Sequence, residues 1–371
     1  MAAMGAPCPE LSADLRLGDS RWAGLRELAS GVDARYLSGR TVLPRGLTTR
    51  LASVRELAEL AGEPIPFPLG ELSFKLAPHG WGRYRFVLVH ELGRIGFSES
   101  GHLPPIRIQP KAELLHAVGP EATVAGFRSV LESECDEVSF AVSRVDLFAD
   151  VQGWALCAED RNRFLCRATN CTTFEEGAGF RGFQFGWRTT KTFSARIYDK
   201  TADVERHGSD WWFGLWGDGY VAAMPVHRIE FEIGRKGLTD FGLDTPGDVL
   251  RAKADLWRYA TGEWLSFRTP TDDSTRARWP IAPEWEQVQR SSLGNRAIGL
   301  ERMSTGRMVG SLRRLMPPLV GYLAAFAAIV GAEEIDDTLG ALDHHLRSDE
   351  IVRRVAFRDR IAERRTRMGA R

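Results

Sequence analysis

The sequence predicts an α+β fold, in which an antiparallel β-sheet with flanking helices is followed by a mostly helical C-terminal domain. Runs of β-branched and aromatic residues, separated by Gly and Pro, fill much of the first 238 residues. Two segments between them, 47–60 and 121–132, have helical character. After residue 238 the chain becomes mostly helical. We therefore expect an N-terminal extension over residues 1–30, a sheet domain over 31–238 and a helical domain over 239–371.

The expected strands follow one another along the sheet domain. They lie at residues 32–38, 84–89, 106–108, 138–150, 182–187, 192–198 and 226–233. The segment 138–150 is the longest of them. Three prolines, Pro64, Pro66 and Pro68, end the first helix.

Composition indicates a folded protein and argues against a disordered chain, a disulfide or zinc framework and a secreted protein. With 371 residues, 43% hydrophobic and 26% charged, the chain can bury a sizeable core. Basic and acidic residues both number 49, so net charge does not indicate a partner. Five cysteines without a CxxC pair favour reduced thiols over a disulfide or zinc framework. The N-terminus lacks the pattern of a secretory signal, and we expect a cytoplasmic protein.

One apolar stretch, residues 315–332, raises the question of a membrane segment. Pro317, Pro318, Gly321 and Gly331 interrupt it, and it is barely as long as the roughly 20 residues that a span needs. A buried C-terminal helix is the favoured interpretation, and we expect no membrane partner.

Three strand segments each place polar residues on one face, because side chains at i and i+2 of a strand share a side. Arg144 and Asp146 form the first pair, and Asp150 rejoins their face if the strand continues. The second segment alternates Arg228, Glu230 and Glu232 with apolar residues, and the third is Arg196, Tyr198 and Lys200. Each segment alone is also typical of a solvated strand face with cross-strand ion pairs.

Together these residues suit phosphodiester chemistry. Carboxylates clustered on a sheet favour a hard cation such as Mg²⁺ or Mn²⁺. A tyrosine hydroxyl becomes a competent nucleophile when nearby cations or a base favour its phenolate. We expect Arg196 and Lys200 to supply those cations for Tyr198.

The three segments, in this order, resemble the replication initiation factor family, which includes rolling-circle plasmid initiators and related nickases of conjugative elements. The resemblance lies in residues 143–150, 195–200 and 227–233, and extends from about residue 32 to about residue 238. It implies an enzyme that makes a site- and strand-specific nick in DNA through a transient 5′-phosphotyrosine and rejoins the strands.

The resemblance also implies roles for particular residues. Tyr198 matches the nucleophile, with Arg196 and Lys200 beside it. The acidic positions of the metal site fall on four residues, Asp146, Glu230, Glu232 and Asp150, and Asp33 lies where relatives often carry Asp. A His-hydrophobic-His metal motif, which better-known rolling-circle nickases carry, is absent from this sequence.

Basic residues indicate where DNA would bind. We expect Arg144 and Arg228 in the sheet, and Arg353 and Arg354 in the arginine-rich C-terminus, to contact phosphates. A charged helix end or a partner-binding tail explains that terminus equally well. Three tryptophans, Trp211, Trp212 and Trp216, either stack on unpaired bases or pack in the core, and core packing is favoured for most of them.

An alternative function uses the same fold without catalysis, as an origin- or transfer-site DNA-binding protein of a mobile element with an inert tyrosine. The joint presence of Tyr198, its flanking cations and the acidic positions favours the enzyme. The resemblance also implies a host helicase as partner, because a nick alone does not unwind DNA. The oligomeric state stays open, a homodimer included.

Overall fold

The computed structural model describes residues 24–177, 179–187, 192–293, 312–353 and 356–368. The chain divides into two compact units between residues 300 and 301, and each is treated by itself below.

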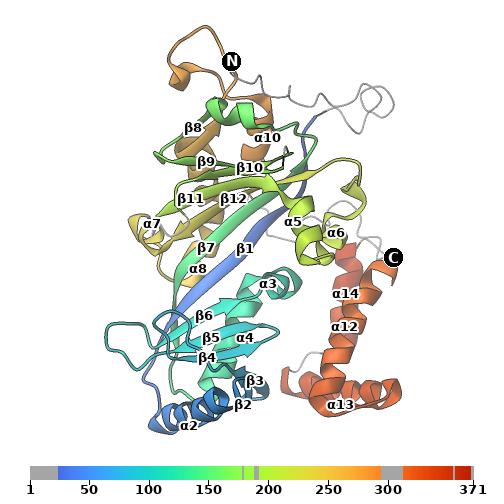
Figure 1. The fold of residues 1–371 in the computed structure, drawn as a ribbon. Coiled ribbons are helices and arrows are strands. Elements are labelled where there is room, and N and C mark those ends of the chain that lie inside the picture. Colours follow the sequence, from blue (N-terminus) through green and yellow to red (C-terminus); the bar gives the residue numbers. More distant parts are fainter. Residues whose placement is uncertain (1–23, 178, 188–191, 294–311, 354–355, 369–371) are drawn as a thin grey trace. The chain divides into compact units, whose positions relative to one another are not determined.

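The described part of the first unit is built on one antiparallel sheet of eleven strands, which Figure 1 shows from one face. In spatial order they are β2 (Ile65–Leu69), β3 (Leu72–Leu76), β4 (Phe86–His90), β5 (Gly93–Phe97), β6 (Ile106–Pro110), β1 (Arg26–Arg40), β7 (Ser139–Gln152), β12 (Val226–Gly234), β11 (Phe193–Asp199), β10 (Gly179–Phe185) and β9 (Cys171–Glu176). The long strands β1 and β7 pair with each other and join the two halves of the sheet. The predicted α+β class is confirmed.

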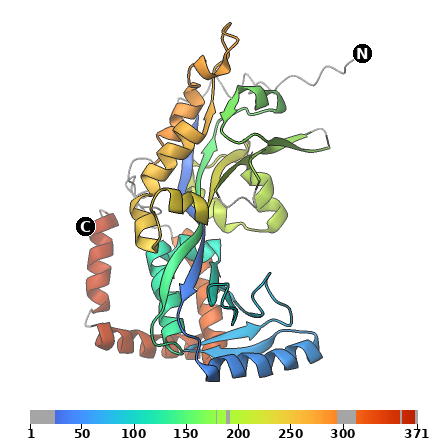
Figure 2. The same cartoon turned by 90° about the vertical axis from the view of Figure 1, so that its left-hand side faces the viewer.

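One face of this sheet carries the core. On β7 and β12, Val145, Leu147, Ile229 and Phe231 point into it and are buried. The helices that contribute to this core are α2 (Arg45–Ala61), α4 (Pro120–Glu132), α7 (Arg235–Asp240), α8 (Pro246–Arg251), α9 (Lys253–Tyr259) and α10 (Pro283–Gln289). Figure 2 shows α8, α9 and α10 on one side of the sheet, with α5 (Lys200–His207) and α6 (Trp211–Trp216) on the other.

Helices that follow the last long strand belong to the same unit. The ring of Trp257 on α9 meets Phe231 on β12 edge to face, with 5.4 Å between their centroids. Trp285 on α10 lies 6.3 Å from Trp154 in the same way. A small second sheet, β8 (Phe164–Cys166) with β13 (Leu265–Phe267), lies in this region. The compact unit therefore continues past residue 238, the predicted end of the sheet domain.

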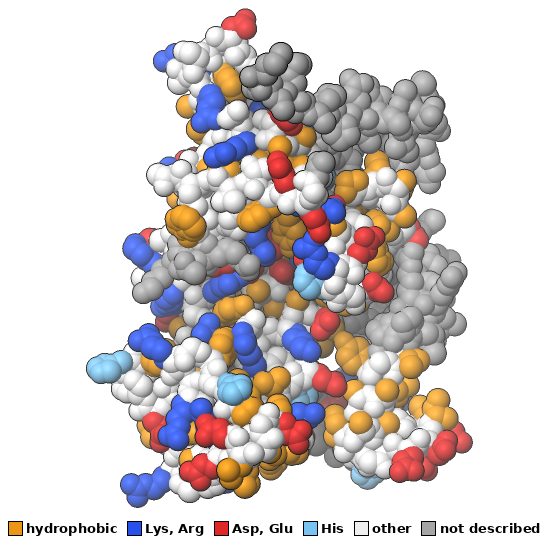
Figure 3. All heavy atoms as spheres, in the orientation of Figure 1, with side chains coloured by type: hydrophobic (Ala, Val, Ile, Leu, Met, Phe, Trp, Pro, Cys, Tyr) orange, Lys and Arg blue, Asp and Glu red, His pale blue; other side chains and the backbone are white. Residues whose placement is uncertain are grey.

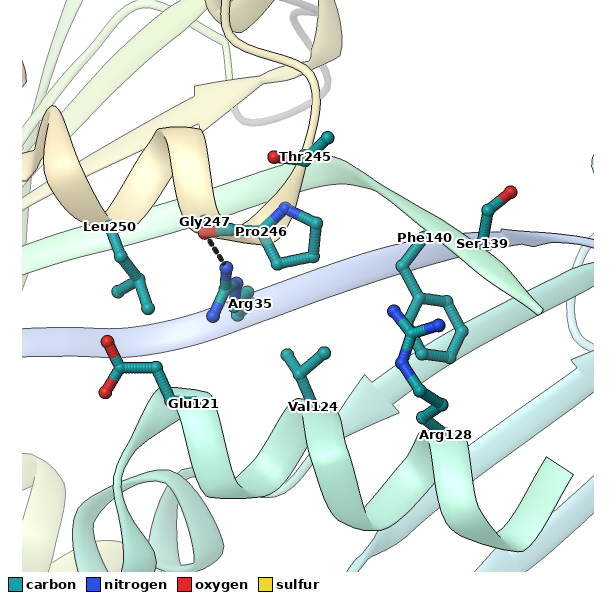
Figure 4. Close-up of a pocket in the computed structure, with 10 residues that line it drawn as sticks. All are labelled: Arg35, Glu121, Val124, Arg128, Ser139, Phe140, Thr245, Pro246, Gly247 and Leu250. Atoms are coloured by element: carbon teal, nitrogen blue, oxygen red, sulfur yellow. Dashed lines mark hydrogen bonds between the residues drawn. The ribbon is translucent and has the colours of Figure 1, made fainter. Parts of the chain in front are cut away.

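A buried arginine ties two helices to the central strand on the core side. Arg35 on β1 is 1% exposed and donates hydrogen bonds to the carbonyls of Pro120, at 3.3 Å, and Pro246. These carbonyls lie in the first turns of α4 and α8. Figure 4 shows the cavity of about 390 Å³ beside it, between these two helices. Because burial disfavours the charged form, the pKa of Arg35 is lowered to about 10.

The described cysteines differ in state. Cys135, Cys166 and Cys171 are free thiols, as expected. Cys157 departs from that expectation because it is disulfide-bonded.

The second unit consists, in its described part, of the helices α12 (Leu312–Val330), α13 (Ile335–Arg353) and α14 (Phe357–Met368). The apolar stretch forms a helix, as predicted, but the prediction that it is buried is wrong. Val320, Tyr322 and Ile329 on α12 are 53%, 58% and 63% exposed, since the neighbouring helix α13 covers only part of its surface. Among the described residues, no helix has the length and apolar character needed to cross a membrane.

Candidate active site

The three polar segments come together on the sheet face opposite the core. Asp146 on β7 pairs with Glu232 on β12, while Glu230 and Arg228 on β12 pair with Arg196 and Tyr198 on β11. Directly opposed residues of antiparallel strands project from the same face. Strand register thus brings together side chains that lie far apart in the sequence.

An arginine joins two of the carboxylates. Arg144 donates to both oxygens of Asp146, with Nε–Oδ1 at 2.7 Å and Nη2–Oδ2 at 2.5 Å. The same Nη2 lies 2.9 Å from Oε2 of Glu232. Burial, reinforced by the charges of Glu230 and Glu232, raises the pKa of Asp146 to about 7 against the opposing effect of Arg144. Negative charge in this cluster is therefore incompletely balanced.

Tyr198 lies at the edge of this cluster and contacts the third carboxylate. Its hydroxyl donates to Oε2 of Glu230 at 3.2 Å, and Oε1 of Glu230 lies 2.5 Å from Nη2 of Arg196. Burial raises the pKa of Tyr198 well above its ordinary value, and Glu230 adds to this, while Arg228 and Arg196 oppose it. The hydroxyl is thus protonated in this arrangement, and a base must take its proton before it can attack.

Lys200 has a different partner from the one expected. Its Nζ lies 2.6 Å from Asp203 on the same helix and 5.9 Å from the centroid of the Tyr198 ring. The cation nearer to that ring is Arg196, whose guanidinium carbon is 5.0 Å from the centroid. Arg196 therefore acts on Tyr198 more directly than Lys200 does.

Two of the predicted site residues form a buried pair instead. Nε of Arg228 lies 2.7 Å from Oδ1 of Asp150, and Nη2 lies 2.8 Å from Oδ2. Trp216 also donates to Oδ2 of Asp150 at 2.8 Å, and both charged side chains are fully buried. The oxygens of Asp150 are engaged away from solvent, so they do not fit the role of metal ligand. Arg228 is equally unable to contact DNA from this position.

Aromatic rings seal this pair. The guanidinium carbon of Arg228 lies 4.0 Å from the ring centroid of Trp212 and 4.2 Å from that of Phe148. Trp212 and Trp216 are 2% and 3% exposed, so the favoured interpretation of core packing holds for both. Neither ring is available to stack on a base.

Two further residues, Asp33 and His116, extend the network. Oδ1 of Asp33 lies 3.0 Å from Nη1 of Arg228 and 3.4 Å from Nε2 of His116 on α3 (Ala112–Val118). Although burial opposes it, Arg228 and His116 hold the pKa of Asp33 well below its ordinary value. Asp33 had a weak signal in the sequence, as an acidic residue in the first strand. His116 had none, because only the packing of α3 brings it here.

The C-terminal DNA contacts cannot be placed in the same way. Arg353 is the last residue of α13, and its side chain lies outside the described part of the chain, as does Arg354 entirely.

The donor atoms are of the kind that a hard divalent cation takes, but Arg144 engages both oxygens of Asp146 and one of Glu232, so an ion would have to displace it. Three carboxylates, Asp146, Glu230 and Glu232, face two guanidinium groups, those of Arg144 and Arg196. Burial is the largest cause of the raised pKa of Asp146, and the charges of Glu230 and Glu232 add to it. Within the residues that the structure describes, no three acidic, His or Cys side chains already have the spacing of a formed metal centre. Oxygen ligands of this kind are those that Mg²⁺ and Mn²⁺ prefer.

The proteins found similar to this chain are solved structures. No family model and no curated protein matches the chain. Among solved structures, the chain is similar to the rolling circle replication initiator protein from Geobacillus stearothermophilus, with a TM-score of 0.42 and 14% sequence identity. The alignment covers 74% of this chain and 97% of that one. At 14% identity, the similarity does not transfer a function.

Proposed function

We propose that this protein nicks and rejoins one strand of DNA, with Tyr198 as the nucleophile. One observation carries the proposal: the Tyr198 hydroxyl donates a hydrogen bond to Glu230, inside a cluster of carboxylates and arginines on the sheet face opposite the core. A buried tyrosine hydroxyl needs a hydrogen-bond partner in any case. A carboxylate partner can also accept its proton, which a tyrosine nucleophile requires.

The chemistry follows from these contacts. Glu230 takes the proton from the Tyr198 hydroxyl, and the phenolate oxygen attacks the phosphorus of a DNA phosphodiester. The bond from phosphorus to the 3′ oxygen breaks, and that oxygen leaves as a 3′ hydroxyl after protonation. The 5′ end stays attached through a phosphotyrosyl ester. Because the ester conserves the energy of the broken bond, the reverse attack by the 3′ hydroxyl rejoins the strand without a nucleotide triphosphate.

A divalent metal is part of this proposal. Asp146 and Glu232 are the residues that would hold Mg²⁺ or Mn²⁺, with Glu230 beside them; the bound ion would polarise the phosphodiester. Its binding can be measured apart from activity. We expect Mn²⁺ to raise the melting temperature of the wild type, since a ligand that binds only the folded state stabilises it. The Asp146→Asn and Glu232→Gln variants should lose that shift, and an undiminished shift in both would remove the metal from the proposal.

The biological setting that we propose is initiation of rolling-circle replication on a mobile element in the cytoplasm. Origin DNA would be the substrate, and a host helicase would unwind the duplex from the nick. Arg353 and Arg354 remain proposed contacts to the DNA backbone.

The decisive experiment is a search for a covalent adduct. The full chain is incubated with supercoiled DNA that contains the sequences flanking its own gene, together with Mn²⁺ or Mg²⁺. We expect relaxed circles and a protein–DNA adduct from the wild type, and neither from Tyr198→Phe. Tyr220→Phe is the matched control, because it removes a phenolic hydroxyl outside the carboxylate cluster. Nicking that survives Tyr198→Phe would identify a different nucleophile.

The non-catalytic alternative has one observation in its favour, which is the raised pKa of the buried Tyr198 hydroxyl. It predicts that the protein binds its origin or transfer site but produces no adduct with any divalent metal. Binding without nicking under all these conditions would favour that alternative.

A further inference from the structure

A second group of side chains lies on the same sheet face as the carboxylate cluster, over the strands of the other half of the sheet. It consists of Arg94 on β5, Arg107 on β6, Tyr36 on β1 and Trp81 in the turn before β4. We call it the arginine–aromatic patch. In the view of Figure 3, Lys and Arg side chains gather across the middle of this face, where β5, β6, β1 and β7 lie in Figure 1.

The patch is built around one indole ring. The guanidinium carbons of Arg94 and Arg107 each lie 3.8 Å from the ring centroid of Trp81. Arg94 also donates to the side chain of Gln109, with Nε–Oε1 at 2.9 Å. Neither arginine forms an ion pair with a carboxylate in the part of the chain that the structure describes. Their positive charge is therefore available to an anionic ligand.

The turn that carries Trp81 is held against the sheet. The N–H of Trp81 donates to the carbonyl of Tyr84 at 3.0 Å, and the N–H of Tyr84 donates back at 3.2 Å. Beneath them, a Cβ placed on Gly96 of β5 would lie 3.0 Å from Cβ of Tyr84 and 3.3 Å from the Trp81 ring. Glycine at this position lets the two aromatic residues lie directly on the strand.

Contacts between side chains connect the patch to the candidate active site. The guanidinium carbon of Arg107 lies 6.0 Å from the ring centroid of Tyr36, and that of Arg144 lies 4.9 Å from the same ring. Arg144 in turn binds Asp146 and Glu232. The face is thus continuous from Trp81 to the carboxylates that lie beside Tyr198.

We propose that the arginine–aromatic patch binds the unpaired DNA strand next to the nick and leads it to Tyr198. This inference rests on the proposed function for its location on DNA, and it names the form of the substrate. Arginines without acidic partners match the phosphates, and the guanidinium planes that Trp81 holds match the faces of bases. A duplex keeps the faces of its bases stacked and hidden, so a single strand is the form of DNA that can use both features.

Binding of single-stranded DNA tests this directly. The full chain with Tyr198→Phe, which cannot form the proposed adduct, is titrated into a fluorescein-labelled oligothymidylate of about 16 nucleotides. Fluorescence anisotropy is measured at several salt concentrations, and a duplex of the same length is measured in parallel.

We expect the double variant Arg94→Gln, Arg107→Gln to bind the single strand at least about tenfold more weakly. Its dependence on salt should also fall, by about 0.7 in log–log slope for each lost phosphate contact. Trp81→Ala should weaken binding by about fivefold or more without that change in slope, because it removes the ring that holds both guanidinium groups and removes no charge. Arg258→Gln, Arg290→Gln is the matched control, since it removes two exposed arginines whose partners are Asp255 and Glu286.

Loss of folding is separated from loss of contact by the conservative pair Arg94→Lys, Arg107→Lys, which should keep the salt slope of the parent protein. Single-strand affinity of the Arg94→Gln, Arg107→Gln variant within twofold of the parent would overturn the inference. So would an equal loss in the control pair, or a loss confined to the duplex. If the wild type forms no adduct but the patch variants still lose single-strand binding, the nicking proposal fails and the patch remains. If the adduct forms and the patch variants bind normally, only the patch fails.

Discussion

Glu230 bridges Tyr198 and Arg196: one of its oxygens accepts a hydrogen bond from the Tyr198 hydroxyl at 3.2 Å, and the other lies 2.5 Å from the Arg196 guanidinium. Glu230 is only 2% exposed, so these two side chains hold its oxygens in place. A carboxylate that accepts a hydrogen bond from a tyrosine hydroxyl whose pKa is raised lies within reach of the proton that a general base would take.

Glu230→Gln should therefore reduce the rate of adduct formation by about 10²- to 10⁴-fold, which is the usual contribution of a general base. Glutamine keeps the shape, and its amide oxygen can still accept from the Tyr198 hydroxyl, but it loses the acceptor for Arg196 and cannot take the proton. The rate is measured on an origin oligonucleotide as the amount of covalent protein–DNA product over time. Glu263→Gln, which removes an exposed carboxylate from the other side of the sheet, serves as the control. A rate unchanged in Glu230→Gln would assign the proton to another acceptor.

Asp150 is predicted to act on stability. Removing one partner of a buried ion pair leaves the other charge without compensation, so Asp150→Ala should lower the free energy of unfolding by about 3–5 kcal/mol. Asp255→Ala is the matched control: its side chain is 71% exposed and its pair with Arg258 is on the surface. That control should cost about 1 kcal/mol or less. Urea unfolding of both variants in EDTA separates a structural role from metal binding. Replacing a residue that only binds metal would not change the free energy of unfolding when EDTA removes the metal.

Much of the site could be predicted from the alternation of residues along single strands. Alternation in 138–150 and 226–233 placed Arg144 with Asp146, and Glu230 with Glu232, on one face, and the structure has the corresponding strands at Ser139–Gln152 and Val226–Gly234. What alternation cannot supply is the partner of each charge, because that depends on register between strands. The pairing of Arg228 with Asp150 lies across two strands, 78 residues apart, and turns two predicted ligands into a buried pair.

Strand β2, at the edge of the sheet, was not predicted from the sequence, for a different reason. Pro66 and Pro68 were expected only to end the preceding helix, yet they lie in strand β2, Ile65–Leu69. This strand is at one end of the sheet and pairs with β3 alone. Proline is tolerated there because an edge strand does not need every N–H for pairing.

Gly182 on β10 lets that strand lie directly against Tyr198, the proposed nucleophile. It pairs with Tyr198, has φ +151°, and a Cβ on it would lie 2.8 Å from Cα and 2.9 Å from Cβ of Tyr198. We expect Gly182→Ala to lower the free energy of unfolding by about 1–3 kcal/mol and to slow adduct formation, because β11 must shift away. Gly179→Ala in the same strand is the control, since its nearest neighbour would be 3.4 Å away. Normal melting and normal activity in Gly182→Ala would mean that β11 accommodates the methyl group without moving Tyr198.

The buried imidazole of His227 should lower the free energy of unfolding as the pH falls. It is 5% exposed and its Nδ1 is buried without a hydrogen-bond partner in the described structure. Burial lowers its pKa from 6.5 to about 4, with Asp199 opposing this only weakly. The folded state therefore disfavours the charged imidazole. The stability that this contributes is complete above pH 6.5 and is lost as the pH falls toward 4.

The shift in the pKa of His227 corresponds to a loss on the order of 3 kcal/mol across that interval. Because other groups titrate there too, the measured quantity is the difference in unfolding free energy between pH 7 and pH 4, compared between proteins. His227→Phe should reduce this difference by about that amount, since phenylalanine acquires no charge. His79→Phe, which removes an exposed imidazole, controls for the substitution itself. An identical pH dependence in wild type and His227→Phe would show that the imidazole is reached by water in acid, and that β12 opens before the rest of the sheet.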